Sequence, residues 1–315
     1  MRYLNELRDG EMVKETYLCK QLLSLKTKTG KSYYSLQLQD KTATLDAKVW
    51  DLGAGIEHFE VMDYIHVEGQ VVSFQGSLQL NVRRLRKSQE GEYNPVDFMP
   101  ITDQDIELMY RTLIQYISKI KQPHLKKLLE SFFIEDKTFA EAFKNHSAAK
   151  SVHHGFIGGL LEHTLGVTKL CDYMADQYPF LQRDLLLAGA MFHDIGKLKE
   201  ISDFPENDYT DEGNLLGHIY IGAEWIGEHI TAIPDFPVKL ASELKHCILA
   251  HHGELEYGSP KKPSLAEALA LSLADNMDAK METIKELLKT GDDKSEWLGF
   301  QRLFDTNIRK TSEQY

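Results

Sequence analysis

The chain has 315 residues, of which 42% are hydrophobic and 27% charged, and its formal net charge is −12. This composition is ordinary for a soluble globular protein, and the length leaves room for two domains with separate cores. No apolar run reaches the roughly 18 residues of a membrane-spanning helix, and the first residues lack the apolar stretch of a signal peptide. The three cysteines have no ligand-like spacing and fit a reducing compartment. We therefore expect a cytoplasmic protein that does not enter a membrane.

The negative charge is unevenly distributed along the chain. Residues 1–90 contain 13 Lys and Arg against 12 Asp and Glu, whereas residues 91–315 contain 23 against 36. The acidity therefore belongs to the later part. This asymmetry permits a locally basic surface on the first domain, although it is a weak signal by itself.

Five short strands are predicted within residues 1–87, because apolar and polar residues alternate there between turn signals. The predicted strands cover residues 16–25, 32–39, 43–50, 64–74 and 78–86. A short helical stretch, 56–60, falls between the third and fourth strands. Five strands with a helix after the third are the layout of an OB-fold barrel. The segments GKSYYSLQLQD (30–40) and LDAKVW (45–50) also resemble the OB-folds of nucleic-acid-binding proteins.

On an OB-fold, nucleic acid crosses strands two and three and contacts the loops after strands one and four. Aromatic rings there stack on bases, and basic side chains follow the phosphates. The alternative is that the rings complete the barrel core and the charges only solvate strand edges. The residues predicted to bind nucleic acid here are Lys26, Lys28, Lys31, Tyr33, Trp50, Phe74, Arg83 and Arg84.

Residues 88–103 contain Gly and Pro signals and are predicted to be a linker. Helices are expected at about 103–121, 124–133 and 137–145, with Thr102 as the N-cap of the first. Their apolar faces suggest that residues 104–150 pack on the second domain, residues 151–315.

The second domain is organised around the stretch LAGAMFHDIGK (187–197), an apolar helical run that ends in His193, Asp194 and Lys197. Adjacent side chains on a helix diverge by about 100°, so this His-Asp pair is poorly placed to hold an ion alone. Ten of the thirteen histidines lie between residues 146 and 252, and a core has no physical reason to concentrate titratable groups. Other helices can each point one polar residue into the same interior. The residues that complete this predicted polynuclear metal site are His163, His218, His251, His252 and Asp275.

This order of histidines and aspartates resembles the HD superfamily of metal-dependent phosphohydrolases over about residues 150–280, and the extra histidines resemble its two-metal subset. The resemblance implies an all-α fold. It also implies that His163, His193, Asp194 and Asp275 hold one ion. Asp194 would bridge to a second ion held with His218 and with His251, His252 or both.

Histidine and carboxylate ligands suit divalent Mn, Co, Fe, Ni or Zn, and we expect two manganese ions. Two cations that share a carboxylate can acidify a water molecule for attack on phosphorus, so Asp194 is assigned a catalytic role. Lys197 is interpreted as a second catalytic residue that contacts phosphate, the alternative being a solvated lysine at a helix end. Lys261 and Lys262, in a stiff loop, are further candidates for nucleic-acid binding. The roles of His153 and His154 stay open.

The OB-fold and the segments SVHHGFIGGLLEHT (151–164) and AHHGELEYGSP (250–260) together resemble the YhaM-type 3′-to-5′ exoribonucleases of Gram-positive bacteria. The resemblance implies hydrolysis of single-stranded RNA, with DNA as an open alternative, to nucleoside 5′-monophosphates by a homo-oligomer. Two other functions are considered: a nucleotide phosphohydrolase or cyclic-dinucleotide phosphodiesterase, and a non-enzymatic adaptor. A full set of costly buried ligands argues against the adaptor.

Overall fold

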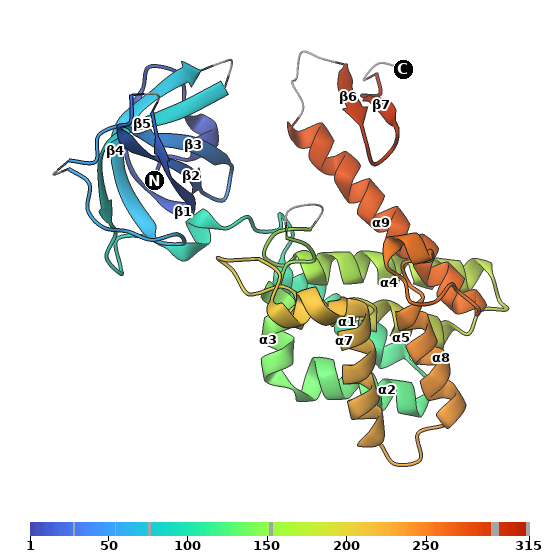
Figure 1. Ribbon diagram of the computed structural model, residues 1–315. Coiled ribbons are helices and arrows are strands. Elements are labelled where there is room, and N and C mark those ends of the chain that lie inside the picture. The colour runs from blue at the N-terminus through green and yellow to red at the C-terminus, as the bar shows by residue number, and fades with distance from the viewer. Residues whose placement is uncertain (28, 54, 75–76, 151–153, 291–295, 313–315) are drawn as a thin grey trace. The chain divides into compact units, whose positions relative to one another are not determined.

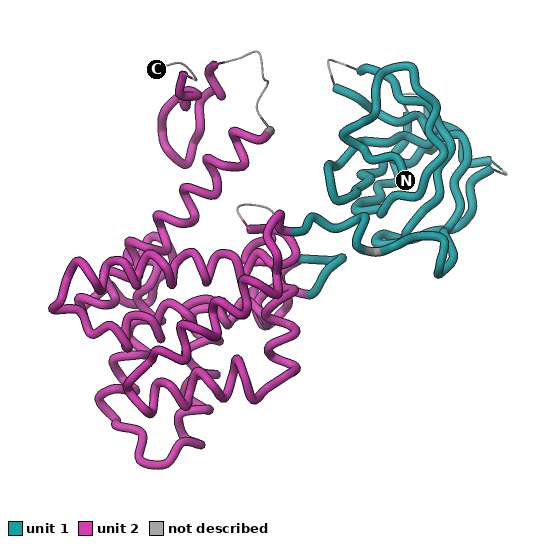
Figure 2. The backbone as a smooth tube through the Cα atoms, turned by 180° about the vertical axis from the view of Figure 1, so that it is seen from behind, with its two compact units in different colours: residues 1–101, 203–207 teal, residues 102–202, 208–315 magenta. Residues whose placement is uncertain are grey.

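The computed structural model describes the chain except for residues 28, 54, 75–76, 151–153, 291–295 and 313–315. It divides into two compact units (Figure 2). The first comprises Met1–Ile101 with Asp203–Asn207, and the second comprises Thr102–Ser202 with Asp208–Tyr315. Within the described residues, no helix is both long and apolar enough to cross a membrane.

The first unit is a closed barrel of five strands, as predicted (Figure 1). The strands are β1 (Met12–Lys26), β2 (Ser32–Gln39), β3 (Thr44–Val49), β4 (Tyr64–Phe74) and β5 (Ser77–Lys87). Around the barrel they follow the order β1-β2-β3-β5-β4, in which β3 and β5 are parallel and the other pairs antiparallel. This closed arrangement is the OB-fold, and closure leaves no free sheet edge.

The barrel core is formed by every second residue of the strands, as the apolar and polar alternation in the sequence predicted. Leu36 and Leu38 of β2 point inward, as do Ile65 and Val67 of β4. The residues that alternate with them, such as Gln37 of β2, are more exposed and form the outer face. The period of two in the sequence therefore sets which side chains are available on the barrel surface.

The short helix expected at residues 56–60 is absent. Ile56 instead forms a bridge with Leu85 of β5, and the backbone N–H of Glu57 donates to the Leu85 carbonyl. These bonds occupy the polar backbone groups that a helical turn would have used. The prediction was wrong because tertiary pairing with β5 outweighs the local helical tendency.

Residues 88–101, predicted to be part of a linker, instead pack on the barrel up to Ile101. Phe98 is buried and makes edge-to-face contacts with Tyr64 and Tyr93, and its carbonyl accepts a hydrogen bond from Gln39. The short 3₁₀ helix η2 (Pro95–Phe98) carries this ring. Gly and Pro signals marked the turns correctly, but they could not show that the aromatic residues between them are buried.

The second unit is helical (Figure 1). Its elements are α1 (Ile106–Lys119), α2 (Pro123–Glu130), the π-helical turn η3 (Ser131–Glu135), α3 (Lys137–Asn145), α4 (Gly159–Gln177), α5 (Arg183–Phe192), α6 (Lys197–Glu200), α7 (Asp211–Thr231), α8 (Val238–Leu249), the 3₁₀ turn η4 (Leu255–Tyr257) and α9 (Ala266–Thr290). The N-cap of α1 is Asp105, which accepts from the N–H of Leu108, and not Thr102 as expected. The Thr102 hydroxyl donates to Glu162 instead.

Helix α4 lies at the centre of this unit. It is buried on almost all sides from Gly159 to Cys171, as a helix is when other helices surround it. Phe132 and Phe192 add an aromatic core beneath it, with ring centroids 5.2 Å apart. After α9 the chain forms a two-stranded hairpin, β6 (Trp297–Gln301) and β7 (Thr306–Arg309), which the sequence analysis did not anticipate.

Candidate metal centre and nucleic-acid surface

Five helices bring the predicted ligands together in the second unit. His163 lies in the second turn of α4, His193 and Asp194 follow α5, and His218 lies within α7. His251 and His252 come directly after α8, and Asp275 lies on α9. The apolar faces of these helices form one core, so their few polar residues meet in its interior.

One group of ligand atoms surrounds the Nε2 atom of His163. The Nε2 atom of His193 lies 3.1 Å from it, Oδ1 of Asp275 3.2 Å and Oδ2 of Asp194 3.4 Å. Ligand atoms bound at about 2.0–2.2 Å to one cation are separated by roughly these distances. The group therefore has the dimensions of a site for one divalent ion.

The other oxygen of Asp194 belongs to a second group. Oδ1 of Asp194 lies 3.4 Å from Nε2 of His218 and 3.7 Å from Nε2 of His251. His252 completes the group, since His218, His251 and His252 each offer an atom within 4.8 Å of the others. Asp194 thus faces one group with each oxygen, as a bridging carboxylate would.

Among the described residues, several of these atoms are buried without a hydrogen-bond partner. They include Oδ1 of Asp194 and the Nε2 atoms of His218 and His251, whereas Oδ2 of Asp194 lies 2.7 Å from Nζ of Lys197. A buried polar atom without a partner costs about 1–3 kcal/mol, and here several acceptors point at one another. Divalent cations would satisfy all of them, so the donor set fits the metals that the sequence predicted.

The opposite nitrogen of each histidine is anchored by an acceptor. In each case the Nδ1–H group donates a hydrogen bond. The pairs are His163 to Oδ2 of Asp278 (2.8 Å), His193 to the Ala190 carbonyl (2.8 Å), His218 to Oε1 of Glu200 (2.9 Å), His251 to the Ile248 carbonyl (2.7 Å) and His252 to the Tyr257 carbonyl (2.8 Å). Such bonds fix the tautomer and leave the Nε2 lone pair free for a cation.

A break in α7 positions His218. Gly217 has φ 72° and ψ 152°, a conformation that only glycine adopts readily. The backbone N–H of His218, removed from the regular helix, donates to Oε1 of Glu200 at 2.9 Å, the same oxygen that the ring nitrogen reaches. Gly217 therefore allows His218 to donate two hydrogen bonds, one from its backbone and one from its ring, to the same carboxylate oxygen of Glu200.

Close packing next to the His-Asp pair also requires glycine. A Cβ added at Gly196 would lie 2.0 Å from the His218 carbonyl. The absence of a side chain at Gly196 lets α7 approach the turn that follows Asp194. The two groups of ligands can therefore share Asp194.

The electrostatics of the centre favour positive charge. Burial alone would raise the pKa of Asp194, but Lys197 and His193 hold it well below its ordinary value. Burial alone would lower the pKa of His163, but Asp194, Asp275 and Asp278 raise it well above the usual range. Burial lowers the pKa of His251, which keeps that ring neutral and able to act as a ligand.

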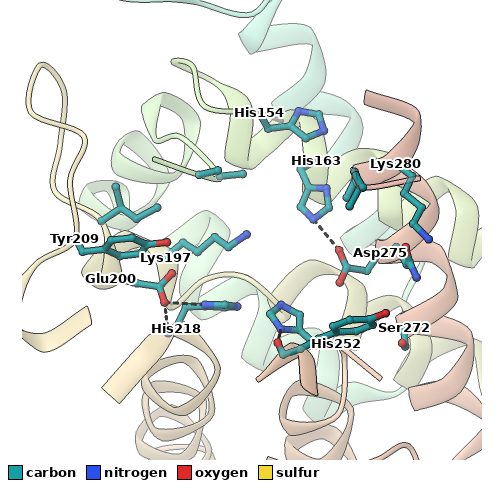
Figure 3. A pocket seen from close by; sticks show the side chains of 17 residues that line it. His154, His163, Lys197, Glu200, Tyr209, His218, His252, Ser272, Asp275 and Lys280 are labelled. Carbon is teal, nitrogen blue, oxygen red and sulfur yellow. Dashed lines mark hydrogen bonds and ion pairs between the residues drawn. The ribbon is translucent and has the colours of Figure 1, made fainter. Parts of the chain in front are cut away.

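A cavity of about 480 Å³ opens beside the centre (Figure 3). His163, His218, His252 and Asp275 line it, together with Lys197, whose Nζ lies 2.7 Å from Oδ2 of Asp194. This volume is within the range of small-ligand sites, about 300–1,000 Å³.

Lys261 and Lys262 are not among the residues that line the cavity. Lys262 forms an ion pair with Glu254 at 2.5 Å. The loop does contribute to the cavity at its beginning, through Tyr257.

On the barrel, two of the predicted residues form a single aromatic surface. Tyr33 and Trp50 stack with ring centroids 4.7 Å apart, and Trp50 is 44% exposed. The indole N–H donates to Oδ1 of Asn81 on β5, which holds the ring over the outer face of β2, β3 and β5. The rings do not complete the core, so they remain available to stack on bases.

The predicted charges on the barrel are spread more widely. Lys26 and Lys31 flank the turn between β1 and β2, and Lys31 lies 3.4 Å from Asp51. Phe74 is exposed at the end of β4. Arg83 and Arg84 are both exposed at an irregularity of β5, and Arg84 lies opposite Glu68 of β4. Lys28 and His153 fall outside the described residues.

Sequence reasoning missed Glu200 and Asp278, the carboxylates that orient His218 and His163. Asp278 follows Asp275 by three residues and therefore lies on the same face of α9, which is a detectable signal. His154 donates from Nε2 to the same Asp278 oxygen at 3.1 Å and also lines the cavity. No comparable sequence signal identifies Glu200, because its contact with His218 depends on the break in α7.

Comparison with known proteins agrees with this geometry. Residues 160–280 match the HD domain family. Curated relatives named 3′-5′ exoribonuclease YhaM include one from Bacillus velezensis, 37% identical over 86% of this chain and 86% of its own, and one from Bacillus subtilis, 37% identical over 89% and 88%. Among solved structures, the second OB-fold domain of replication protein A from Methanococcus maripaludis aligns with 29% of this chain and 96% of its own, at 18% identity and a TM-score of 0.24.

Proposed function

This chain belongs to the family of 3′-5′ exoribonucleases named YhaM, and we propose that it removes nucleoside 5′-monophosphates from the 3′ end of single-stranded RNA by metal-dependent hydrolysis. The observation that carries the proposal is the set of buried ligand atoms that meet beside a cavity, several of them without a hydrogen-bond partner among the described residues. A binding protein would have no reason to keep so costly an arrangement.

The ligands divide between two ions in this proposal. His163, His193 and Asp275 hold the first, His218, His251 and His252 hold the second, and Asp194 bridges them. Manganese is our choice of metal, since both groups mix imidazole with carboxylate. When bound, the two cations supply charge that neutralises the phosphodiester, and they lower the pKa of water toward neutrality.

The chain's own residues position the substrate and hold charge in place. Lys197 is paired with Asp194, and its ammonium group lines the cavity, where it is placed to contact a phosphoryl oxygen as charge develops. Asp278 and Glu200 keep His163 and His218 in the ligand orientation through their Nδ1–H groups. Because these groups are fixed before substrate arrives, little reorganisation is needed during the reaction.

The barrel supplies affinity for the rest of the RNA strand. The Tyr33–Trp50 pair offers an exposed stacking surface, and the exposed basic side chains elsewhere on the barrel attract phosphates. Stacking does not depend on base identity, which suits an enzyme that must pass along any sequence. We take RNA as the preferred substrate and single-stranded DNA as a weaker one.

We also propose that the enzyme is a cytoplasmic homo-oligomer. Its three cysteines are buried thiols without disulfides, as expected in a reducing compartment. Helix α9 exposes a row of large apolar side chains at four-residue spacing that a second copy would cover: Leu269, Leu273, Met277 and Met281, each 52–58% exposed. Met277→Glu should lower the mass measured by light scattering, and an unchanged mass would place the interface elsewhere.

The function is tested with RNA oligomers that differ only at the 3′ end. An oligomer with a free 3′ hydroxyl should yield 5′-monophosphates in the presence of Mn, and one ending in a bulky 3′ cap should resist. Deoxynucleoside triphosphates and cyclic dinucleotides serve as competing substrates. Faster turnover of either, with no release from the RNA, would reject the exoribonuclease and favour a nucleotide phosphohydrolase.

A further inference from the structure

A row of polar side chains on α9 extends from the candidate metal centre along the cavity wall. Ser272, Asn276 and Lys280 follow one another at four-residue spacing, and all three line the cavity together with Asp275 (Figure 3). Residues four apart lie on one face of a helix. The row therefore forms a polar edge that begins about one turn before Asp275 and ends more than one turn beyond it.

Lys280 differs from the other charged residues of this cavity. Lys197 pairs with Asp194, and Glu200 accepts from His218. Among the described residues, none forms an ion pair or hydrogen bond with Lys280, which is exposed on α9. The remaining members of the row, Ser272 and Asn276, are uncharged hydrogen-bonding residues. This end of the cavity is therefore suited to an anion that the metal centre itself does not hold.

The position of Lys280 indicates which phosphate of the substrate this anion would be. It lies five residues beyond Asp275, which corresponds to about 7.5 Å along the helix axis. The long lysine side chain adds reach to this separation of backbone positions, so its ammonium group can contact a phosphate adjacent to one held at the metal centre. If the terminal phosphodiester lies at the metal centre, the released nucleotide carries no further phosphate. The next phosphate must then belong to the strand that remains.

We propose that Lys280, with Asn276 and Ser272, binds the phosphodiester immediately upstream of the bond that is cut. This inference rests on the proposed function and adds a substrate subsite to it. The ligand is a single negatively charged backbone phosphate, which a lysine recognises as a point charge. The subsite would favour substrates of three or more nucleotides, since a dinucleotide has no upstream phosphodiester.

The test uses two RNA trinucleotides in the full-length protein. Both have an ordinary scissile linkage, and in one the upstream phosphodiester is replaced by an uncharged methylphosphonate. We measure kcat/KM for the first cleavage and, separately, binding by fluorescence anisotropy. Lys280→Ala is compared with Lys280→Arg, which keeps the charge, and with Lys239→Ala, which removes an equal charge from an exposed position on α8 outside the cavity.

Lys280→Ala should weaken binding and lower kcat/KM for the normal trinucleotide by about two- to fivefold, the range for an exposed charge contact. It should have no effect on the methylphosphonate, and the salt slope of log K should flatten by about 0.7. Lys280→Arg should retain most of the affinity, and Lys239→Ala should match the wild type. Equal losses on both trinucleotides, or none on either, would overturn the subsite. If no monophosphate is released but the binding difference persists, the proposed function fails while the subsite stands.

Discussion

Removing the Glu200 carboxylate should weaken one metal ion selectively. Glu200 accepts two bonds from His218 through a single oxygen, one from the backbone N–H and one from Nδ1, both at 2.9 Å. In Glu200→Ala the imidazole loses the acceptor that fixes its tautomer and orientation. Loss of such a partner typically lowers metal affinity 10- to 100-fold, which corresponds to about 1.4–2.7 kcal/mol.

Calorimetric titration of the metal-free protein with Mn is the assay. The wild type should bind two ions, and Glu200→Ala should retain one at normal affinity while the other weakens. Glu200→Gln keeps an acceptor oxygen without the charge and should fall between the two. Glu224→Ala is the matched control, at an exposed position on α7 whose carboxylate accepts, within the described part of the chain, from Tyr220 alone. Equal weakening of both ions, or of neither in a correctly folded variant, would refute the assignment of Glu200 to His218.

Three further substitutions test other parts of the account. Asp194→Asn should abolish turnover and reduce the bound metal while leaving the circular dichroism spectrum unchanged, because it removes the bridging charge at nearly constant volume; activity at the wild-type level would exclude a bridging role. Lys197→Ala should lower kcat by about 100-fold with little change in RNA affinity, as expected for a contact made mainly in the transition state, and a loss confined to binding would contradict this. Trp50→Ala should cost about 1–3 kcal/mol of affinity for long single-stranded RNA and leave dinucleotide turnover intact; unchanged anisotropy curves would remove the ring from the binding surface.

The sequence predicted the barrel well because its strands repeat every two residues and its turns contain glycine. It failed at residues 56–60, where local composition favours a helix but Ile56 pairs with Leu85. It failed again at Phe98, which lies among turn residues and is nevertheless buried. Both errors concern segments whose conformation depends on distant parts of the chain.

The candidate metal centre could be located from the sequence because histidine and aspartate are rare within apolar helices. The residues that orient the ligands were harder to find. Glu200 contacts His218 only because Gly217 interrupts α7, and neither the interruption nor its direction is encoded in a periodic pattern. The role of the barrel charges stays a prediction, since exposed lysines and arginines at strand ends look alike in sequence whether or not they share a surface.

The central claim is that a centre for two cations removes nucleotides from the 3′ end of RNA. It is tested most directly with one single-stranded RNA labelled either at the 5′ or at the 3′ end, incubated with the full-length protein and Mn, with and without a chelator. We expect immediate release of the 3′ label as a mononucleotide, progressive shortening of the 5′-labelled strand, and no reaction after chelation. Release of the 5′ label as the first mononucleotide, internal cleavage, or full activity in the presence of the chelator would contradict it.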